Sequence, residues 1–201
     1  MNELDIKLFY KYLDKCTNYF EFGSGGSTYQ ALIRDNIKSV YSIENHKPYF
    51  NELSKKLSEK SLNLDKLNYI LIDMKTKPNT TGHPIRKLSY DKMKLCYIQW
   101  NKYSKYLKNL DKNISKTIDF ILIDGRFRAA SLLNSFTVIN DNTFIAFDDF
   151  YGKSPPREEY YHVVLDYYDI IERGDILVIL KKKNVEPPSQ GIISKYQKIW
   201  L

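Results

Sequence analysis

The chain has 201 residues, of which 43% are hydrophobic and 27% are charged, so it is long enough for one α/β domain with a full hydrophobic core. The net charge is +7, and residues 86–116 contain nine basic and two acidic side chains. Because the whole chain is rich in lysine, we interpret this segment as a solvated face, and nucleic-acid binding is disfavoured.

The sequence carries no mark of export or of membrane insertion. Residues 1–5 include acids where a signal peptide would be basic, and no apolar run approaches the length needed to cross a bilayer. Cys16 and Cys96 lie far apart in sequence and are interpreted as reduced structural thiols. These features predict residence in the cytoplasm, or in the host cytoplasm if the protein is viral, and they leave a homo-oligomer open.

The first predicted elements are a helix, a strand and a glycine-rich turn. Apolar residues at spacings of three and four predict an amphipathic helix over residues 3–16. Tyr19–Phe22 has the character of a buried strand, and three glycines follow it within four residues. Ser27 or Thr28 can cap the next predicted helix, over residues 28–35.

The turn resembles a nucleotide-binding turn with an acid in front of it. Gly23-x-Gly25 has dinucleotide-type spacing, but Thr28 stands where another small residue is expected. The carboxylate of Glu21 would repel a pyrophosphate and attract a ligand with an amino group and a sulfonium. S-adenosylmethionine is such a ligand, and Glu21, Gly23, Gly25, Ser27 and Thr28 are predicted to form its binding turn.

A second carboxylate follows the next predicted strand. Residues 39–43 are β-branched and aromatic, and the strand ends at Glu44. Glu44 follows Gly23 by 21 residues, close to the roughly 20 at which an acid after the second strand reaches ribose hydroxyls. One β-α-β unit is therefore predicted to bind a nucleoside.

The middle of the chain predicts a scaffold and a lid. A lysine-rich helix is expected over residues 47–60, and a third strand over residues 69–72. Asp73 and Met74 follow that strand and are expected to hold the adenine. Residues 75–116 are predicted to be an insertion, first a polar loop and then a helical pattern, that acts as a substrate lid at the ligand edge of the sheet.

Three further acids are predicted to meet at this same edge. A buried strand over residues 119–123 ends at Asp124, and a fifth strand over residues 144–147 ends at Asp148 and Asp149. Like charges repel, so three neighbouring carboxylates require a cation or bound protons.

The rest of the chain predicts two helices, a hairpin and a tail. Helices are expected over residues 126–137 and 157–168, the second of which contains His162. A β-hairpin over residues 170–180 is expected to close the sheet, and residues 184–201 form a tail without an assigned place.

The acids at the strand ends, taken together, resemble the class I S-adenosylmethionine-dependent methyltransferases. The turn from Glu21 to Gly25 is similar to their first motif, and Ile123–Arg126 and Phe147–Phe150 resemble glycan and sugar O-methyltransferases of bacteria and giant viruses. The resemblance implies a single Rossmann-like three-layer α/β domain over residues 1–183. Its mostly parallel seven-stranded sheet would have the order 3-2-1-4-5-7-6, with a C-terminal antiparallel hairpin.

The resemblance also implies an activity and a set of roles. The activity is methylation of a sugar hydroxyl of a glycan or of a nucleotide-linked sugar. Relatives of the catechol and macrolide-sugar type imply magnesium ligands at Asp124, Asp148 and Asp149, where the ion would activate the hydroxyl. Without a metal, Asp124 would hold the donor's amino group, and Asp149 or His162 would act as the general base.

The sequence motifs also bear on other activities. Base methylation of nucleic acids is disfavoured, because Asp124–Phe127 lacks the Pro-Pro-Tyr sequence that such enzymes carry and Cys96 lies in a helical pattern. A non-catalytic methyltransferase-like binding module and a metal-dependent glycosyltransferase stay open. Glu21 favours S-adenosylmethionine over a sugar nucleotide, and the acceptor is expected to be a small molecule or a glycan.

Overall fold

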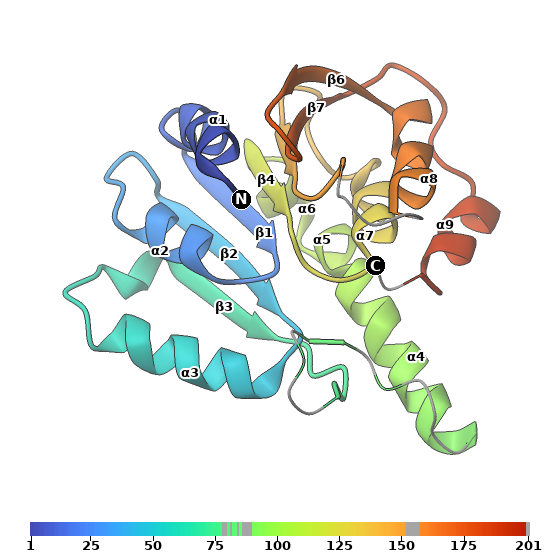
Figure 1. Ribbon diagram of the computed structural model, residues 1–201, viewed down its shortest axis with the longest axis horizontal. Coiled ribbons are helices and arrows are strands. Elements are labelled where there is room, and N and C mark those ends of the chain that lie inside the picture. The colour runs from blue at the N-terminus through green and yellow to red at the C-terminus, as the bar shows by residue number, and fades with distance from the viewer. Residues whose placement is uncertain (78–79, 81, 84, 86–89, 152–156, 200–201) are drawn as a thin grey trace.

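A computed structural model describes residues 1–77, 80, 82–83, 85, 90–151 and 157–199 (Figure 1). Its centre is a seven-stranded sheet in the order β3-β2-β1-β4-β5-β7-β6, in which only β7 runs antiparallel to its neighbours, β5 and β6. The predicted fold class, strand order and hairpin are confirmed. The strands are β1 (Asn18–Phe22), β2 (Ser39–Glu44), β3 (Leu67–Leu71), β4 (Phe120–Ile123), β5 (Phe144–Phe147), β6 (Tyr168–Arg173) and β7 (Val178–Lys182).

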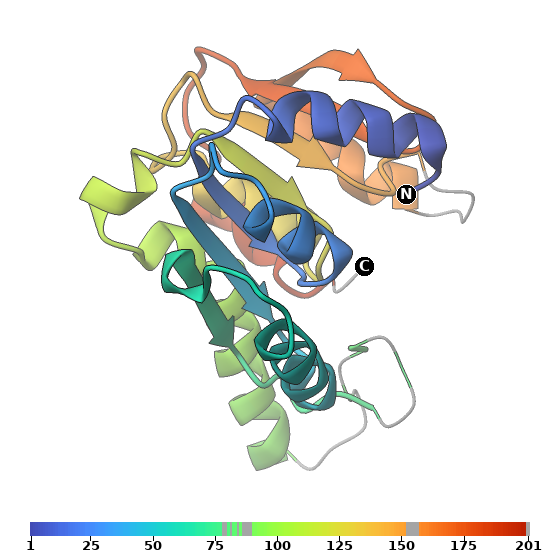
Figure 2. The same ribbon diagram turned by 90° about the vertical axis from the view of Figure 1, so that its left-hand side faces the viewer.

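Helices cover both faces of the sheet, as Figures 1 and 2 show. One face carries α1 (Glu3–Leu13), α2 (Gly26–Leu32) and α3 (Lys47–Ser58). The other carries α4 (Tyr90–Ser104), α5 (Tyr106–Asn109), α7 (Arg128–Ser135) and α9 (Gln190–Tyr196). The remaining short helices are η1 (Leu64–Lys66), α6 (Lys112–Ser115), α8 (Arg157–Tyr161) and η2 (His162–Asp166).

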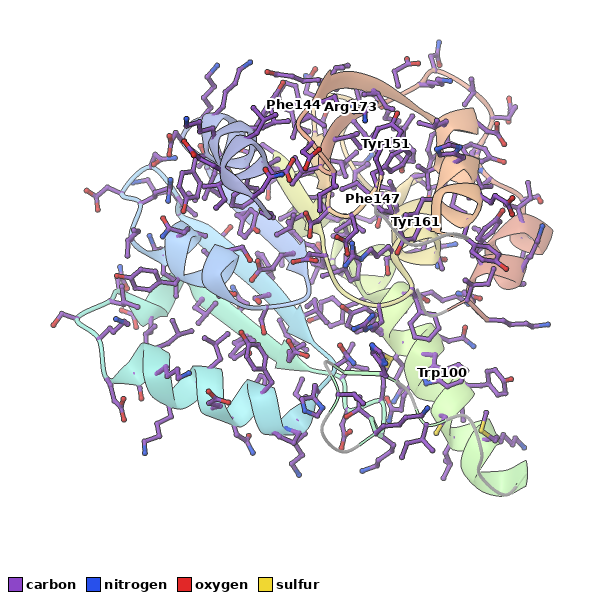
Figure 3. All side chains as sticks on the ribbon, in the orientation of Figure 1. Trp100, Phe144, Phe147, Tyr151, Tyr161 and Arg173 are labelled. Carbon is purple, nitrogen blue, oxygen red and sulfur yellow. The ribbon has the colours of Figure 1, made fainter. Side chains whose placement is uncertain are left out.

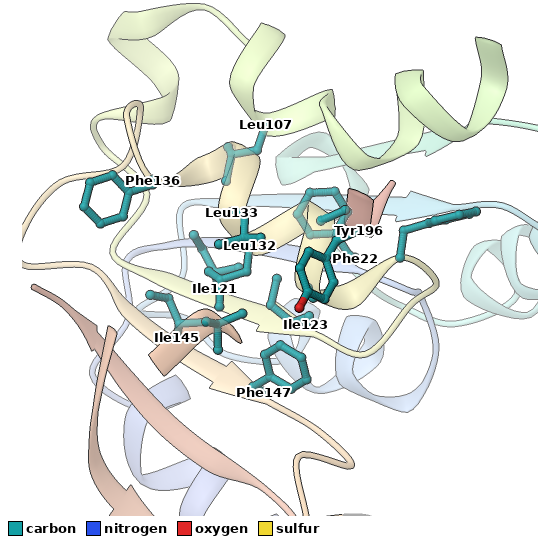
Figure 4. Packing of buried hydrophobic residues seen from close by; sticks show 14 of the residues in the cluster. Phe22, Leu107, Ile121, Ile123, Leu132, Leu133, Phe136, Ile145, Phe147 and Tyr196 are labelled. Carbon is teal, nitrogen blue, oxygen red and sulfur yellow. The ribbon is translucent and has the colours of Figure 1, made fainter. Parts of the chain in front are cut away.

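The central strands separate two apolar layers, because successive side chains of a strand point to opposite faces. In β4, Phe120 and Leu122 pack in the layer under α1 to α3, whereas Ile121 and Ile123 pack under α7. Figure 4 shows Ile121 and Ile123 in this second layer. Burial on both faces explains the continuous apolar run of this parallel strand.

Parts of the expected insertion and of the expected tail belong to these layers. Trp100 and Tyr103 of α4 and Leu107 of α5 are buried in the core, and both helices pack against α7. In the expected tail, α9 packs against α7 and buries Ile193 and Tyr196. Any lid within residues 75–116 therefore has to come mainly from the segment before α4.

Several helices are shorter than their apolar periodicity predicted. The helix expected over residues 126–137 is α7, which begins after Phe127, a residue in the left-handed conformation. The helix expected over residues 157–168 divides into α8 and η2 and stops before Tyr168, which already pairs with Lys182 in the sheet. In the described ranges, none of the helices is both long and apolar enough to span a membrane.

Candidate functional site

A cavity of about 650 Å³ opens at the carboxyl ends of β1, β2, β4 and β5. Its volume lies within the range of small-molecule sites, and it sits where the strand order reverses between β1 and β4, the usual ligand position in such sheets. Its walls come from Gly23, Ser24, Glu44, Asn45, His46, Pro48, Tyr49, Glu52, Thr80, His83, Asp124, Gly125, Arg126, Arg128 and Asp149.

Two glycines bring the loops after β1 and β4 into backbone contact at the cavity. Gly23 has a φ of 93°, and a Cβ atom there would lie 2.8 Å from the Cα atom of Gly125. A Cβ atom on Gly125 would overlap the hydroxyl oxygen of Tyr103. Only residues without side chains fit here, so the two loops pack backbone against backbone, and both glycines lie in the cavity wall.

Glu21 lies beneath the glycine turn and is fully buried. Its carboxylate accepts hydrogen bonds from Tyr19 (2.9 Å), Ser27 (2.6 Å), Ser42 (2.6 Å) and Thr28. Burial raises the pKa of Glu21, and the four hydroxyls act in the opposite direction. Neither Glu21 nor Ser27 nor Thr28 is a cavity-wall residue, so in this structure they hold the shape of the turn.

Glu44 stands in the cavity wall at the end of β2 and is 5% exposed. One carboxylate oxygen accepts the backbone N–H groups of Asn45 and His46, each at 2.7 Å. The other accepts the hydroxyl of Ser24 at 2.7 Å, and this hydroxyl lies 2.8 Å from that of Tyr69. The carboxylate is thus fixed in position before any ligand binds.

Asp73 and Met74 do not reach the cavity. Met74 is fully buried in the core, and Asp73 accepts hydrogen bonds from the backbone N–H and the ammonium of Lys75, both at 3.0 Å. Because β3 ends at Leu71, Asp73 lies beyond the strand instead of directly at its end. The structure thus gives the predicted adenine contacts no support at these two positions.

The loop after β3 is attached to the cavity by residues that follow Glu44. The Asn45 side-chain amide donates to the carbonyl of Gly82 (2.9 Å), and the Nδ1 atom of His46 lies 2.5 Å from the Thr76 hydroxyl. Thr80 and His83 of this loop reach the cavity wall. The loop therefore borders the ligand space, and its closure over a ligand stays a prediction.

Asp124, Asp148 and Asp149 meet at the ends of β4 and β5, with the guanidinium of Arg128 among them. Nη2 of Arg128 lies 3.0 Å from an Asp124 carboxylate oxygen and 3.1 Å from an Asp149 carboxylate oxygen. Nη1 donates to the carbonyl of Asp148, and Nε donates to the carbonyl of Gly125 at 3.0 Å. One guanidinium thus joins the two loops.

Burial and mutual repulsion change the ionisation of this cluster. Burial, followed by the charge of Asp124, raises the pKa of Asp148 to about 7. Burial also raises the pKa of Asp124, which shares a side-chain hydrogen bond with Asp148. The Asp148 carboxyl oxygen Oδ1 is buried without a hydrogen-bond partner, which costs less for a neutral carboxyl than for a carboxylate.

The acids as arranged do not fit the predicted magnesium ion. Asp124 and Asp149 direct oxygens at Arg128, and Asp148 is engaged with Asp124. Within the part of the chain that the structure describes, no three acid, histidine or cysteine side chains are grouped to hold a metal ion. The predicted need for a cation or for bound protons is met by the arginine and by the raised pKa of Asp148.

His162 does not join the cavity wall. Its side chain is exposed, at the start of η2, and its ring lies 5.6 Å from that of Phe150 and 6.3 Å from that of Tyr151. Tyr151 in turn stacks under Arg173, whose guanidinium carbon is 3.7 Å from the ring centroid, and both are labelled in Figure 3.

Most residues of the cavity wall had no predicted role, among them His83, Arg126 and Arg128. Arg128 begins α7, and Asp124 lies outside this helix at the end of β4, so no helical spacing indicated their contact. His83 lies in a polar loop without periodicity, and its position follows from tertiary contacts that no local pattern encodes.

Comparison with known proteins gives a likeness in structure but none in sequence. No protein-family model matches the chain, and no curated protein sequence matches it. A methyltransferase-like protein from Silicibacter pomeroyi superposes with a TM-score of 0.78 and 18% identity, over 99% of this chain and 96% of that one.

Two further solved structures share the architecture at lower similarity. One is a candidate caffeoyl-CoA O-methyltransferase from Staphylococcus aureus (TM-score 0.58, 15% identity, 91% of this chain and 85% of that one). The other is a candidate methyltransferase from Streptococcus mutans in complex with S-adenosylhomocysteine (TM-score 0.54, 10% identity, 91% of this chain and 100% of that one). With its strand order and antiparallel β5-β7-β6 edge, the chain has the fold of the class I S-adenosylmethionine-dependent methyltransferases.

Proposed function

We propose that the chain is an S-adenosylmethionine-dependent O-methyltransferase that methylates a sugar hydroxyl of a glycan or of a nucleotide-linked sugar. The observation that carries this proposal is the cavity at the strand-order reversal, with the fixed carboxylate of Glu44 in its wall and the bare backbones of Gly23 and Gly125 beside it. A nucleoside with an amino-acid tail fits such a site, the ribose on Glu44 and the tail along the glycines.

The charge of the cavity supports a cationic donor. Its wall contains four carboxylates (Glu44, Glu52, Asp124 and Asp149) and two guanidiniums (Arg126 and Arg128). An excess of negative charge attracts a sulfonium and an amino group, and it opposes the pyrophosphate of a dinucleotide or of a sugar-nucleotide donor. This balance weighs against the glycosyltransferase alternative.

The proposed reaction is a direct transfer. The acceptor oxygen bonds to the methyl carbon while the carbon–sulfur bond breaks, S-adenosylhomocysteine leaves, and the hydroxyl proton passes to a base. We assign the base to Asp149, which lies in the cavity wall, with His83 of the same wall as the alternative. Asp124 would hold the donor's amino group, and residues 75–89 would close over the acceptor.

Mass spectrometry of reactions with S-adenosylmethionine and a panel of sugars, nucleotide sugars and glycans tests the activity. We expect one acceptor to gain a methyl group while an equal amount of S-adenosylhomocysteine forms. Asp149→Asn should lower kcat by about 10²-fold or more, with donor affinity nearly unchanged. Asp141→Asn, which changes an exposed acid paired with Lys182, serves as the matched control.

Two other results would redirect the proposal. Donor binding without formation of S-adenosylhomocysteine from any acceptor would favour the non-catalytic binding module. Release of a nucleoside diphosphate from a nucleotide sugar would favour a glycosyltransferase.

A further inference from the structure

The strand-end acids enclose a cation that belongs to the chain itself. Arg128 is only 7% exposed, and its guanidinium contacts carboxylates from both loops, Asp124 at 3.0 Å and Asp149 at 3.1 Å. Its other two nitrogens donate to backbone carbonyls of the same loops, at Gly125 and Asp148. Every guanidinium nitrogen therefore has a partner in the cluster.

The position of Arg128 is unfavourable apart from these contacts. Arg128 is the first residue of α7, where the helix dipole disfavours a positive charge. Burial of a guanidinium is also costly unless carboxylates and hydrogen bonds compensate it. Burial would lower the pKa of Arg128, but the charge of Asp124 and other nearby groups raises it instead. The acids and the arginine thus stabilise one another.

We propose that Arg128 is a built-in cation that takes the place of a divalent metal ion at Asp124 and Asp149, so that the site works without metal. A magnesium ion would need these same oxygens at about 2.1 Å, while Nη2 of Arg128 already lies 3.0 and 3.1 Å from them. Two cations cannot share that space without strong repulsion.

A variant without the guanidinium of Arg128 should gain a site for a divalent ion. Carboxylate oxygens are the ligands that magnesium and manganese prefer. Removal of the guanidinium takes away the positive charge that Asp124 and Asp149 share beside Asp148, so a divalent ion should enter where the wild type excludes it. The catalytic meaning of this exchange rests on the proposed function, but ion binding can be measured without donor or acceptor.

Titration of the full chain with manganese(II) chloride, followed by the loss of the free-ion electron paramagnetic resonance signal, tests the proposal. Wild type and Arg34→Ala, which removes an arginine paired with Asp14, should bind no ion saturably. Arg128→Ala should bind one ion per chain, with an affinity at least about tenfold higher than any binding seen with the wild type. The double variant Arg128→Ala/Asp149→Asn should lose that site, and Arg128→Lys should exclude the ion again.

Two results would overturn the proposal. One is saturable manganese binding by the wild type that Asp149→Asn abolishes, because ion and arginine would then coexist. The other is a folded Arg128→Ala chain that binds no ion. If circular dichroism shows that Arg128→Ala does not fold, Arg128→Gln takes its place. The titration of the wild type needs no variant, and by itself it shows whether manganese binds beside Arg128. A failed methyl-transfer assay changes neither result, so the two proposals are tested separately.

Discussion

At the scale of single residues, the buried carboxyl of Asp148 links the stability of the protein to pH. Its folded pKa of about 7 lies above that of a free aspartate, about 3.9. Protonation of Asp148 therefore stabilises the fold, fully so below about pH 4. This contribution is lost as the pH rises through about 7.

The variant Asp148→Asn tests this linkage, because the amide stays neutral at every pH and can still donate to Asp124. We expect similar melting temperatures for wild type and variant at about pH 4, and a higher one for the variant at pH 8. The difference should be on the order of a few kcal/mol in unfolding free energy. Parallel pH profiles of the two proteins in thermal melts would contradict the assignment.

The acids of the site were predictable, and their partners were not. Asp124, Asp148 and Asp149 follow apolar runs, and parallel strands bring their carboxyl ends to one edge. Arg128 acquires its role only when β4 and β5 become neighbours, so a magnesium ion was predicted in its place. Met74 was expected at the adenine, but the layer under α4 buries it instead.

At the scale of elements, the contact between the loops after β1 and β4 depends on glycine. We expect Gly125→Ala to lower the melting temperature and weaken donor binding, because the new methyl group would overlap the Tyr103 hydroxyl and crowd the backbone N of Gly23, 3.0 Å away. Adding Tyr103→Phe should restore part of the stability, since it removes the overlapping oxygen.

Gly191→Ala is the matched control for this loss, because its added Cβ would have only the Ser189 hydroxyl nearby, at 3.8 Å. It should be neutral or stabilise α9 by up to about 1 kcal/mol. Thermal melts and donor titrations of the variants measure both expected effects, the lower melting temperature and the weaker donor binding of Gly125→Ala. A Gly125→Ala chain that melts and binds like Gly191→Ala would show that the loops have room to separate.

The bounds of strands and helices were predicted well where one local sequence pattern determines them. They were predicted less well where tertiary packing determines where an element ends. The strands follow short apolar runs, and the five that were predicted individually, β1 to β5, begin and end within two residues of the prediction. Helix ends depend on tertiary contacts, as in the division of the 157–168 helix before Tyr168 pairs with Lys182. The helix within residues 184–201 is short, and its stability comes from packing against α7.

At the scale of the whole molecule, the layered body supports a cavity bordered by one loop, and closure of that loop is a prediction. Backbone hydrogen bonds from Lys77 to His83 (2.8 Å) and from Ile85 to Lys75 (3.3 Å) order its described residues. Peptides covering residues 75–89 should exchange hydrogen more slowly when S-adenosylhomocysteine and an acceptor bind together. Peptides from α9 should not change. Equal exchange of the loop with and without both ligands would count against a lid.

Calorimetric titration with S-adenosylhomocysteine tests the central claim, that this cavity is a donor site, most directly. We predict binding of one molecule per chain, weakened in Glu44→Gln by about 1–3 kcal/mol because bonds to the ribose are lost. Glu59→Gln is the matched control, because Glu59 is an exposed acid paired with Lys55 of α3. This variant should bind S-adenosylhomocysteine like the wild type. Preferential binding of NAD, or equal affinity of Glu44→Gln and wild type for S-adenosylhomocysteine, would contradict the account.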